Sequence, residues 1–224
     1  MKKALVVGAT GATGKLVLEK LLLSDEFDKI YTLSRRDVFI QHTKLNSFSV
    51  DFVKLDSFTF PDGVEIDQLY FCYGTTLKKA GGKDAFKKIE GEFSEKILNL
   101  ALRSHIQRVL LVSSLGANES SSILYNQIKG KIEKHVKELG FPEVVIFRPS
   151  LLMTEREELR VGELISQKFL RPFSNLFQSV APQYAPISTE NLSDEMIHWG
   201  KKASLEKSLI ILENSDLHKK SSKF

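Results

Sequence analysis

The sequence predicts an α/β fold in which helices flank a doubly wound parallel sheet, and two observations carry this prediction. Short apolar runs typical of buried strands alternate with segments of helical period through the first two thirds of the chain. A glycine-rich stretch, GATGATG at residues 8–14, separates the first apolar run from the first amphipathic segment. Such alternation is typical of βαβ units, whose right-handed crossovers build a parallel sheet. The 224 residues suit one domain with a sizeable core.

The expected strands are short runs rich in aliphatic and aromatic residues. They lie at residues 4–7, 30–33, 48–50, 69–73, 109–113, 144–147 and 209–212. The expected helices have apolar residues three and four positions apart. They lie at residues 15–23, 86–101 and 124–139, with a shorter one at 159–170. On the helix at 86–101, the apolar face is marked by Phe86, Ile89, Phe93 and Ile97.

The pattern changes after the stretch FRPS, which ends at Ser150. Residues 151–186 hold scattered charges and three prolines without another clear strand, so we expect a small lid on the substrate side of the domain. The Rossmann-type domain is expected to span residues 1–213. Residues 214–224 are expected to form a frayed basic tail.

Composition narrows the functional classes. The net charge of +4 is modest and no element shows a stripe of Lys and Arg, so we expect neither a nucleic acid nor a membrane surface as a partner. The single cysteine, Cys72, rules out an intrachain disulfide, and the histidines have no spacing typical of a metal site. The first apolar run is interrupted by Gly8, unlike a signal peptide. We therefore expect a cytoplasmic protein, monomeric or weakly dimeric.

The turn at residues 8–14 has the spacing of a dinucleotide-binding motif. A P-loop would need Gly where Ala9 stands and Ser or Thr where Leu16 stands, so a nucleotide triphosphatase is disfavoured. Glycines permit a tight turn, close approach of a pyrophosphate and close packing of the helix on its strand. The turn residues expected to hold the pyrophosphate are Gly8, Thr10, Gly11, Ala12, Thr13 and Gly14.

The residues after the second strand bear on the choice of dinucleotide. NAD sites usually place an acidic residue there for the ribose 2′-hydroxyl, whereas a 2′-phosphate needs cations. Here Ser34, Arg35 and Arg36 offer a hydroxyl and two guanidinium groups. NADP(H) is therefore favoured, and Asp37 leaves NAD(H) open.

A second informative stretch, SSLGANESSSILYNQIK, follows the fifth expected strand. Tyr125 and Lys129 are four residues apart at the start of a helix, hence on one face. A neighbouring ammonium stabilises a phenolate, so this pair suits proton transfer. Ser113 and Ser114 end the preceding strand, where a hydroxyl can support charge that develops on a substrate oxygen.

With these motifs in place, the chain resembles the atypical and extended short-chain dehydrogenases/reductases. The stretches FCYGTT, LVSSLGANESSSILYNQIKGKIE and FRPSLL resemble more narrowly the Tat-interactive-protein-2 family. The resemblance implies that Tyr125 is the acid/base, that Lys129 also holds the nicotinamide ribose, and that Ser114 rather than Ser113 is the active hydroxyl. Further cofactor contacts implied by it are Asp51 and Phe52 at adenine, then Gly74, Thr75, Thr76, Pro149, Leu151 and Leu152.

These features together predict an NADP(H)-dependent oxidoreductase that acts on a small carbonyl or alcohol substrate by hydride transfer. The alternative is a regulatory protein in which the bound dinucleotide orders the chain for a protein partner, as the resemblance also implies for some relatives. The complete Ser–Tyr–Lys set favours the enzyme.

Overall fold

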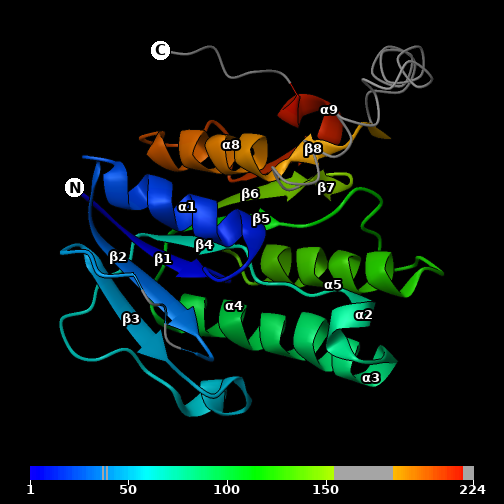
Figure 1. The fold of residues 1–224 in the computed structure, drawn as a ribbon, viewed down its shortest axis with the longest axis horizontal. Helices are drawn as coiled ribbons and strands as arrows, with labels where there is room; N and C mark the ends of the chain where they lie inside the picture. The colour runs from blue at the N-terminus through cyan, green and yellow to red at the C-terminus, as the bar shows by residue number, and fades with distance from the viewer. Residues whose placement is uncertain (37, 39, 154–183, 219–224) are drawn as a thin grey trace, which may run out of the picture.

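A seven-stranded parallel sheet forms the centre of the protein, seen here in a computed structural model that describes residues 1–36, 38, 40–153 and 184–218 (Figure 1). The strand order is β3-β2-β1-β4-β5-β6-β9, and every neighbouring pair is parallel. The strands are β1 (Lys2–Val7), β2 (Phe27–Ser34), β3 (Leu45–Ser49), β4 (Gln68–Phe71), β5 (Arg108–Val112), β6 (Glu143–Arg148) and β9 (Leu209–Glu213). The predicted α/β fold class with a doubly wound parallel sheet is confirmed.

Helices cover both faces of this sheet (Figure 1). The helices α1 (Ala12–Leu23) and α8 (Thr189–Lys201) lie side by side on one face, whereas α4 (Phe93–Arg103) and α5 (Leu124–Glu138) lie on the other. Shorter helical segments are η1 (Phe52–Ser57), α2 (Leu77–Ala80), α3 (Lys83–Phe86) and α9 (Asn214–Leu217). The result is a three-layer helix–sheet–helix sandwich.

The alternation of side chains along each strand divides the core in two. In β1, Leu5 and Val7 belong to the apolar cluster on the α4–α5 side, while Ala4 and Val6 belong to the cluster on the α1–α8 side. Successive side chains of a strand point to opposite faces, so a central strand with helices on both sides must be apolar throughout. This requirement explains why the strands were visible in the sequence as unbroken apolar runs.

The helix expected at residues 86–101 is interrupted in the structure. The chain forms α3, then a π-helical turn η2 (Lys87–Glu92), and only then α4. This wider turn brings Glu90 inward, where it is fully buried, while Ile89 is only partly buried. Turns of this type are frequent near functional sites.

The C-terminal part also differs from expectation. A two-stranded sheet joins β7 (Leu152–Met153) to β8 (Ile187–Ser188), so a short strand begins the segment expected to be a lid. The rest of that segment, including the helix expected at 159–170, lies outside the described residues. The domain also extends past residue 213, because α9 packs against β9 with Asn214 and Leu217 buried. The last part of the expected basic tail lies outside the described residues.

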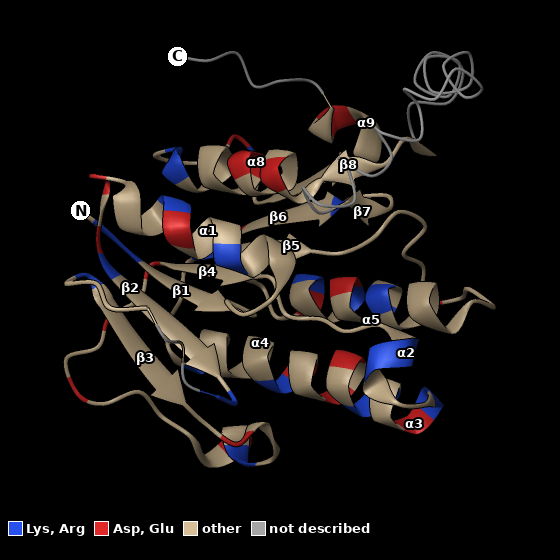
Figure 2. Cartoon of the chain, in the orientation of Figure 1, with Lys and Arg blue, Asp and Glu red and all other residues tan. Residues whose placement is uncertain are grey.

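Charges of both signs are mixed along the larger helices. Figure 2 shows Lys or Arg near Asp or Glu on α1, α5 and α8, whereas the charged residues of the short helix α2 are lysines alone. No described helix is long and apolar enough to cross a membrane.

The loop between β5 and α5 lies directly on a glycine of α5. A Cβ atom at Gly130 would stand 2.2 Å from the backbone carbon of Asn118 and 2.2 Å from the nitrogen of Glu119. We expect Gly130→Ala to reduce the free energy of unfolding by roughly 2 kcal/mol or more, because backbone cannot yield as a side chain can. Urea-induced unfolding followed by circular dichroism measures this loss.

A matched control is Gly91→Ala, since Gly91 is also helical and its added Cβ would meet only Ile128 Cγ2, at 3.8 Å. That variant should stay within about 1 kcal/mol of the wild type. Equal stability of the two variants would contradict the close approach at Gly130.

Candidate functional site

The candidate residues gather at one edge of the sheet because each set follows the C-terminal end of a parallel strand. In chain order, these residues follow β1 (Gly8), β2 (Arg35), β3 (Asp51), β4 (Gly74), β5 (Ser114) and β6 (Pro149). The strand order reverses between β1 and β4. In open parallel sheets, ligands bind in the crevice at such a reversal.

The glycine turn after β1 is packed against the neighbouring strand end and against its own helix. Gly8 has a φ of +90°, and a Cβ there would lie 2.4 Å from the carbonyl oxygen of Cys72. A Cβ at Gly14 would lie 2.2 Å from the carbonyl oxygen of Gly8. These two positions therefore exclude any side chain, as the spacing of the motif predicted.

The N-terminus of α1 lies at the same edge of the sheet. Its N-cap residue, Gly11, provides no side-chain hydrogen bond to the first turn of the helix. Thr10, Gly11 and Ala12 are exposed, whereas Thr13 and Gly14 are buried. Unpaired backbone N–H groups and the positive end of the helix dipole suit a phosphate group.

The residues after β2 lie at this edge too, at the surface of the protein. Arg35 and Arg36 are exposed, and the Ser34 hydroxyl donates a hydrogen bond to the carbonyl oxygen of Arg36. Asp37, the residue that leaves NAD(H) open, lies outside the described residues. Burial raises the pKa of Tyr73 to about 12, although the nearby Arg35 guanidinium lowers it in part. The Tyr73 hydroxyl is buried without a hydrogen-bond partner among the described residues.

The pair expected at adenine is divided between surface and core. Asp51 is exposed and accepts a 3.0 Å hydrogen bond from the backbone N–H of Val53, which caps η1. Phe52 is 1% exposed, and its ring packs against Tyr73 and Phe93. Asp51 keeps a second carboxylate oxygen for a ligand, whereas Phe52 offers a ligand almost no exposed surface.

The segment after β4 is tied to a buried carboxylate that the sequence analysis missed. The backbone N–H of Thr75 donates a 2.6 Å hydrogen bond to Glu90 Oε2. Gly74 lies so close that a Cβ on it would stand 3.2 Å from Glu90 Oε1. Thr76 caps α2 by accepting a 3.2 Å hydrogen bond from the backbone N–H of Lys79.

The two serines after β5 have different environments. Ser113 donates a 2.6 Å hydrogen bond to Oε1 of the buried Glu133, which also receives two hydrogen bonds from Arg148. Ser114 Oγ is buried without a hydrogen-bond partner among the described residues. The structure thus commits the Ser113 hydroxyl to internal packing and leaves that of Ser114 for a ligand.

Tyr125 and Lys129 lie on one face of α5, as their spacing predicted. Tyr125 is 38% exposed and its ring stacks on Phe86. The Lys129 ammonium lies 6.0 Å from the centre of the Tyr125 ring, and its side chain is only 5% exposed. Lys129 Nζ stands 2.5 Å from Glu90 Oε1 and donates a 3.3 Å hydrogen bond to the carbonyl oxygen of Val112. The buried Lys129 ammonium thus lies close enough to the partly exposed Tyr125 phenol to act on it electrostatically.

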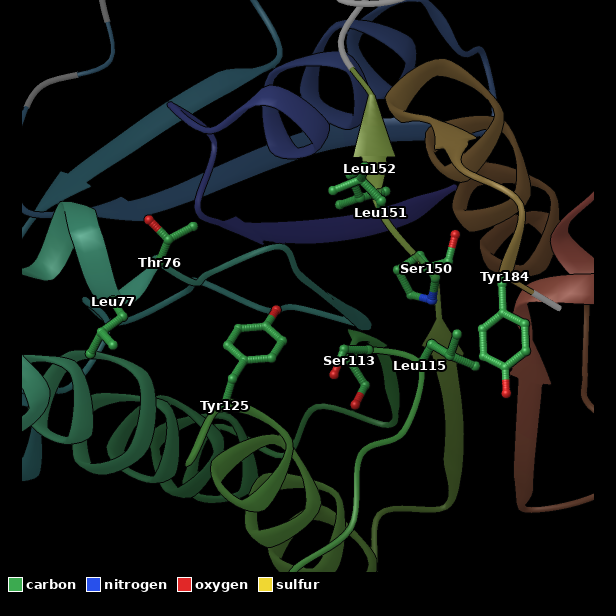
Figure 3. A pocket seen from close by; sticks show the side chains of 11 residues that line it. Thr76, Leu77, Ser113, Leu115, Tyr125, Ser150, Leu151, Leu152 and Tyr184 are labelled. Atoms are coloured by element: carbon green, nitrogen blue, oxygen red, sulfur yellow. The ribbon is translucent and has the colours of Figure 1, made fainter. Parts of the chain in front are cut away.

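Tyr125, Ser113 and Ser114 line one cavity of about 640 Å³ (Figure 3). Tyr125 projects into it from the start of α5, opposite Leu151 and Leu152, and Tyr184 approaches from the other side. The lining residues are Thr76, Leu77, Ser113, Ser114, Leu115, Tyr125, Pro149, Ser150, Leu151, Leu152 and Tyr184. Five of these eleven residues are Leu or Pro and the other six are Ser, Thr or Tyr, so the cavity combines apolar surface with several hydroxyl groups.

Ser150, which lines the cavity, forms hydrogen bonds to Asn214 at the start of α9 and to Ala185. Ser150 N donates a 2.8 Å hydrogen bond to Asn214 Oδ1, and Ser150 Oγ donates a 2.5 Å hydrogen bond to the carbonyl oxygen of Ala185. Tyr184 follows the segment outside the described residues, and no motif in the sequence indicated it. Among the described residues, no group of three or more His, Cys, Asp and Glu side chains could hold a metal ion.

Comparison with known sequences reveals clear relatives, although no protein-family model matches the chain. The chain is 37% identical to Protein HTATIP2 of Rattus norvegicus over 192 residues, which cover 84% of this chain and 77% of that protein. It is 36% identical to the mitochondrial Protein FMP52-1 of Scheffersomyces stipitis over 159 residues, or 69% of each chain. It is 34% identical to the mitochondrial Protein fmp52 of Aspergillus fumigatus over 172 residues, which cover 73% of this chain and 72% of that protein.

These relatives correct one expectation. The prediction of a cytoplasmic location is wrong, because several FMP52 relatives are named as mitochondrial proteins. The prediction rested on composition and on an interrupted first apolar run. Those features do not distinguish the cytoplasm from a mitochondrion.

Solved structures with a similar fold include dehydrogenase-family proteins. A short chain dehydrogenase family protein from Francisella tularensis superposes with a TM-score of 0.67 at 14% identity, over 96% of this chain and 98% of that one. MoeE5, solved in complex with UDP-glucuronic acid and NAD, superposes with a TM-score of 0.67 at 11% identity, over 94% of this chain and 75% of that one. The chain therefore belongs to the family of HTATIP2 and FMP52, and it shares the fold of a short chain dehydrogenase family protein.

Proposed function

We propose that the protein is an NADP(H)-dependent oxidoreductase that acts on a small, largely apolar carbonyl or alcohol substrate. One observation carries the proposal: the Tyr125 phenol and the unpaired Ser114 hydroxyl line the same cavity, and the Lys129 ammonium lies beneath the phenol. These are the three functional groups that carbonyl reduction needs from a protein.

Several features at the same edge of the sheet support the binding of a dinucleotide. The positions of Gly8 and Gly14 exclude side chains, and the N-terminus of α1 offers unpaired backbone N–H groups. Two buried hydroxyls without partners among the described residues, those of Tyr73 and Ser114, follow β4 and β5 at the same edge of the sheet. The structural neighbour MoeE5 was solved with NAD, which supports a nicotinamide dinucleotide as the ligand class.

The proposed preference for NADP(H) rests on the surface after β2. The guanidinium groups of Arg35 and Arg36 are exposed there and can form paired hydrogen bonds to a 2′-phosphate. The expected exposed contacts to the rest of the cofactor are Thr10, Gly11, Ala12, Asp51, Gly74 and Thr76.

The chain's own residues would handle the proton. When bound, the nicotinamide supplies a hydride to the carbonyl carbon or accepts one from the alcohol carbon. In the reductive direction, Tyr125 donates its phenolic proton to the carbonyl oxygen as the C=O π electrons move onto that oxygen. Ser114 donates a hydrogen bond to the same oxygen while its charge develops. The phenolate left behind is stabilised by Lys129 and takes a proton from solvent, which its partial exposure allows.

The substrate class follows from the cavity wall. The side chains around Tyr125 and Ser114 are mainly Leu, Pro and Tyr, supplied by β7, the loop after Ser114 and the start of α2. Such a surface favours an apolar body, while the two hydroxyls orient one oxygen atom. We therefore propose an aliphatic or aromatic ketone, aldehyde or secondary alcohol in preference to a sugar nucleotide.

Replacing the phenol tests the acid/base assignment. We expect Tyr125→Phe to lower turnover on a panel of apolar carbonyl compounds by about 100-fold or more, since it removes the proton donor. NADPH affinity, measured by fluorescence titration, should stay within about threefold of the wild type. Unchanged turnover in Tyr125→Phe would contradict the acid/base role of Tyr125. A wild type that binds NADPH and a protein partner but reduces none of the carbonyl compounds would contradict the enzymatic role.

The two serines provide a matched pair of variants. Ser114→Ala should reduce kcat by about 100-fold through loss of a donor to the substrate oxygen, with little change in stability. Ser113→Ala should instead reduce the free energy of unfolding by roughly 1–3 kcal/mol, because it removes a hydrogen bond to a buried carboxylate. Steady-state kinetics and urea unfolding on both variants make the comparison. A reversed pattern would reassign the active hydroxyl to Ser113.

Cofactor preference is tested on the arginine after β2. We expect the wild type to bind NADPH more tightly than NADH, and Arg35→Ala to weaken NADPH binding by about 10–100-fold through loss of charge-assisted hydrogen bonds. NADH affinity serves as the internal control and should hardly change. Equal affinities of the wild type for the two dinucleotides would defeat the 2′-phosphate argument.

A further inference from the structure

Glu90 and Lys129 form an ion pair that is almost completely removed from water. The Glu90 side chain is 0% exposed and that of Lys129 is 5% exposed, with 2.5 Å between Oε1 and Nζ. Taking either charge alone from water would cost far more than a protein of this size can supply. Each group therefore depends on the other to remain charged.

The same carboxylate is anchored to the segment that follows β4. Glu90 Oε2 accepts a 2.6 Å hydrogen bond from the backbone N–H of Thr75, and the absence of a side chain at Gly74 leaves room for the carboxylate. Glu90 thus bridges α5, which carries Lys129, and the backbone at residues 74–76. Under the proposed function, this backbone runs along the cofactor.

Four ionisable groups surround the Lys129 ammonium. They are Glu90 on η2, Tyr125 and Glu133 on α5, and the Cys72 thiol after β4. The charge of Glu133 is already shared by Arg148, with its two hydrogen bonds, and by Lys137 at 3.7 Å. Burial raises the pKa of the Cys72 thiol to about 12, so this thiol contributes no charge near neutral pH. Glu90 is thus the counter-charge in direct contact.

The influences on the pKa of Lys129 also identify Glu90 as its main counter-charge. Burial by itself lowers the pKa of Lys129, but the Glu90 carboxylate, helped by Tyr125, outweighs burial and holds the pKa above its ordinary value. Removing the carboxylate would leave burial as the main influence. A buried amine without a counter-charge releases its proton readily.

We infer that Glu90 is a positioning residue that keeps Lys129 in its charged form within a buried site and fastens it to the Thr75 segment. The importance of Lys129 to chemistry rests on the proposed function, whereas the ion pair itself does not. Without Glu90, a neutral Lys129 would neither stabilise a Tyr125 phenolate nor offer a charged donor to the cofactor.

The experiment follows the protonation of Lys129 directly. Protein labelled with ¹³C-lysine is titrated by NMR, and Lys129→Met identifies the Lys129 Cε signal. In the wild type, we expect the signal to remain that of an ammonium to a pH above the ordinary lysine range. In Glu90→Gln, which keeps the size of the side chain, the titration midpoint should fall by at least about two and a half pH units, to about pH 8 or below.

Glu92→Gln is the matched control, because Glu92 lies in the same π-helical turn but is exposed. Its Lys129 midpoint should equal that of the wild type. A folded Glu90→Gln whose Lys129 midpoint matches the wild type would overturn the inference. Should Glu90→Gln fail to fold, the wild-type titration still decides, because a wild-type midpoint below the ordinary lysine range would also overturn it.

A second readout connects the pair to ligand binding. NADPH affinity is measured between pH 7 and 9 for Glu90→Gln and Glu92→Gln. We expect the ratio of their dissociation constants to grow by about tenfold over this range, as Lys129 loses its charge in the first variant only. A constant ratio would contradict a role toward the cofactor. Absence of NADPH binding in the wild type would contradict the proposed function alone, since the titration stands without it.

Discussion

The candidate site depends on one constraint: a carboxylate buried inside the protein needs a positive charge or hydrogen-bond donors beside it. Two glutamates on neighbouring helical segments meet it in different ways. Glu133 takes the hydroxyl of Ser113 and the guanidinium of Arg148, and Glu90 takes the ammonium of Lys129 and a backbone N–H. An unpaired buried acid costs several kcal/mol, so these contacts are not optional. The contact with Glu133 engages the Ser113 hydroxyl and leaves the Ser114 hydroxyl without a partner among the described residues. The contact with Glu90 fixes the position of the Lys129 ammonium.

Much of the fold could be predicted because its physical causes are local. Each central strand of the parallel sheet lies between two helical layers and must be apolar on both faces, and the runs around Val6 and Leu110 show this directly. The turn after β1 could be predicted because close approach of backbone demands glycine at positions 8 and 14. The π-helical turn at η2 could not, since its width is set by what Glu90 must reach across the core. The two-stranded β7–β8 pair joins segments far apart in the chain, which no local pattern reveals.

Sequence spacing could show that Tyr125 and Lys129 lie together, but it could not show a residue such as Glu90 that acts through another side chain. Tyr125 and Lys129 share a helix face, so four residues of separation suffice to place them together. Glu90 was overlooked although a signal existed: it lies four residues after Phe86 and three before Phe93, within the apolar face, where an acid must have a buried partner. The sequence analysis assigned that face to Ile89 instead. Tyr184 carried no signal, because only the tertiary fold brings it to the cavity.

In the candidate site, the charged groups are buried, whereas the groups that line the cavity carry no charge. The charges of Lys129 and Glu90 are buried and paired within the protein, so water screens them little and salt should affect them weakly. The groups that face the cavity, Tyr125 and Ser114, are neutral hydroxyls, which are far cheaper to expose or to desolvate than ions. An apolar substrate can therefore displace water from the cavity wall without stripping water from a charge. Under the proposed function, the charge that stabilises the Tyr125 phenolate is therefore in place before a substrate binds.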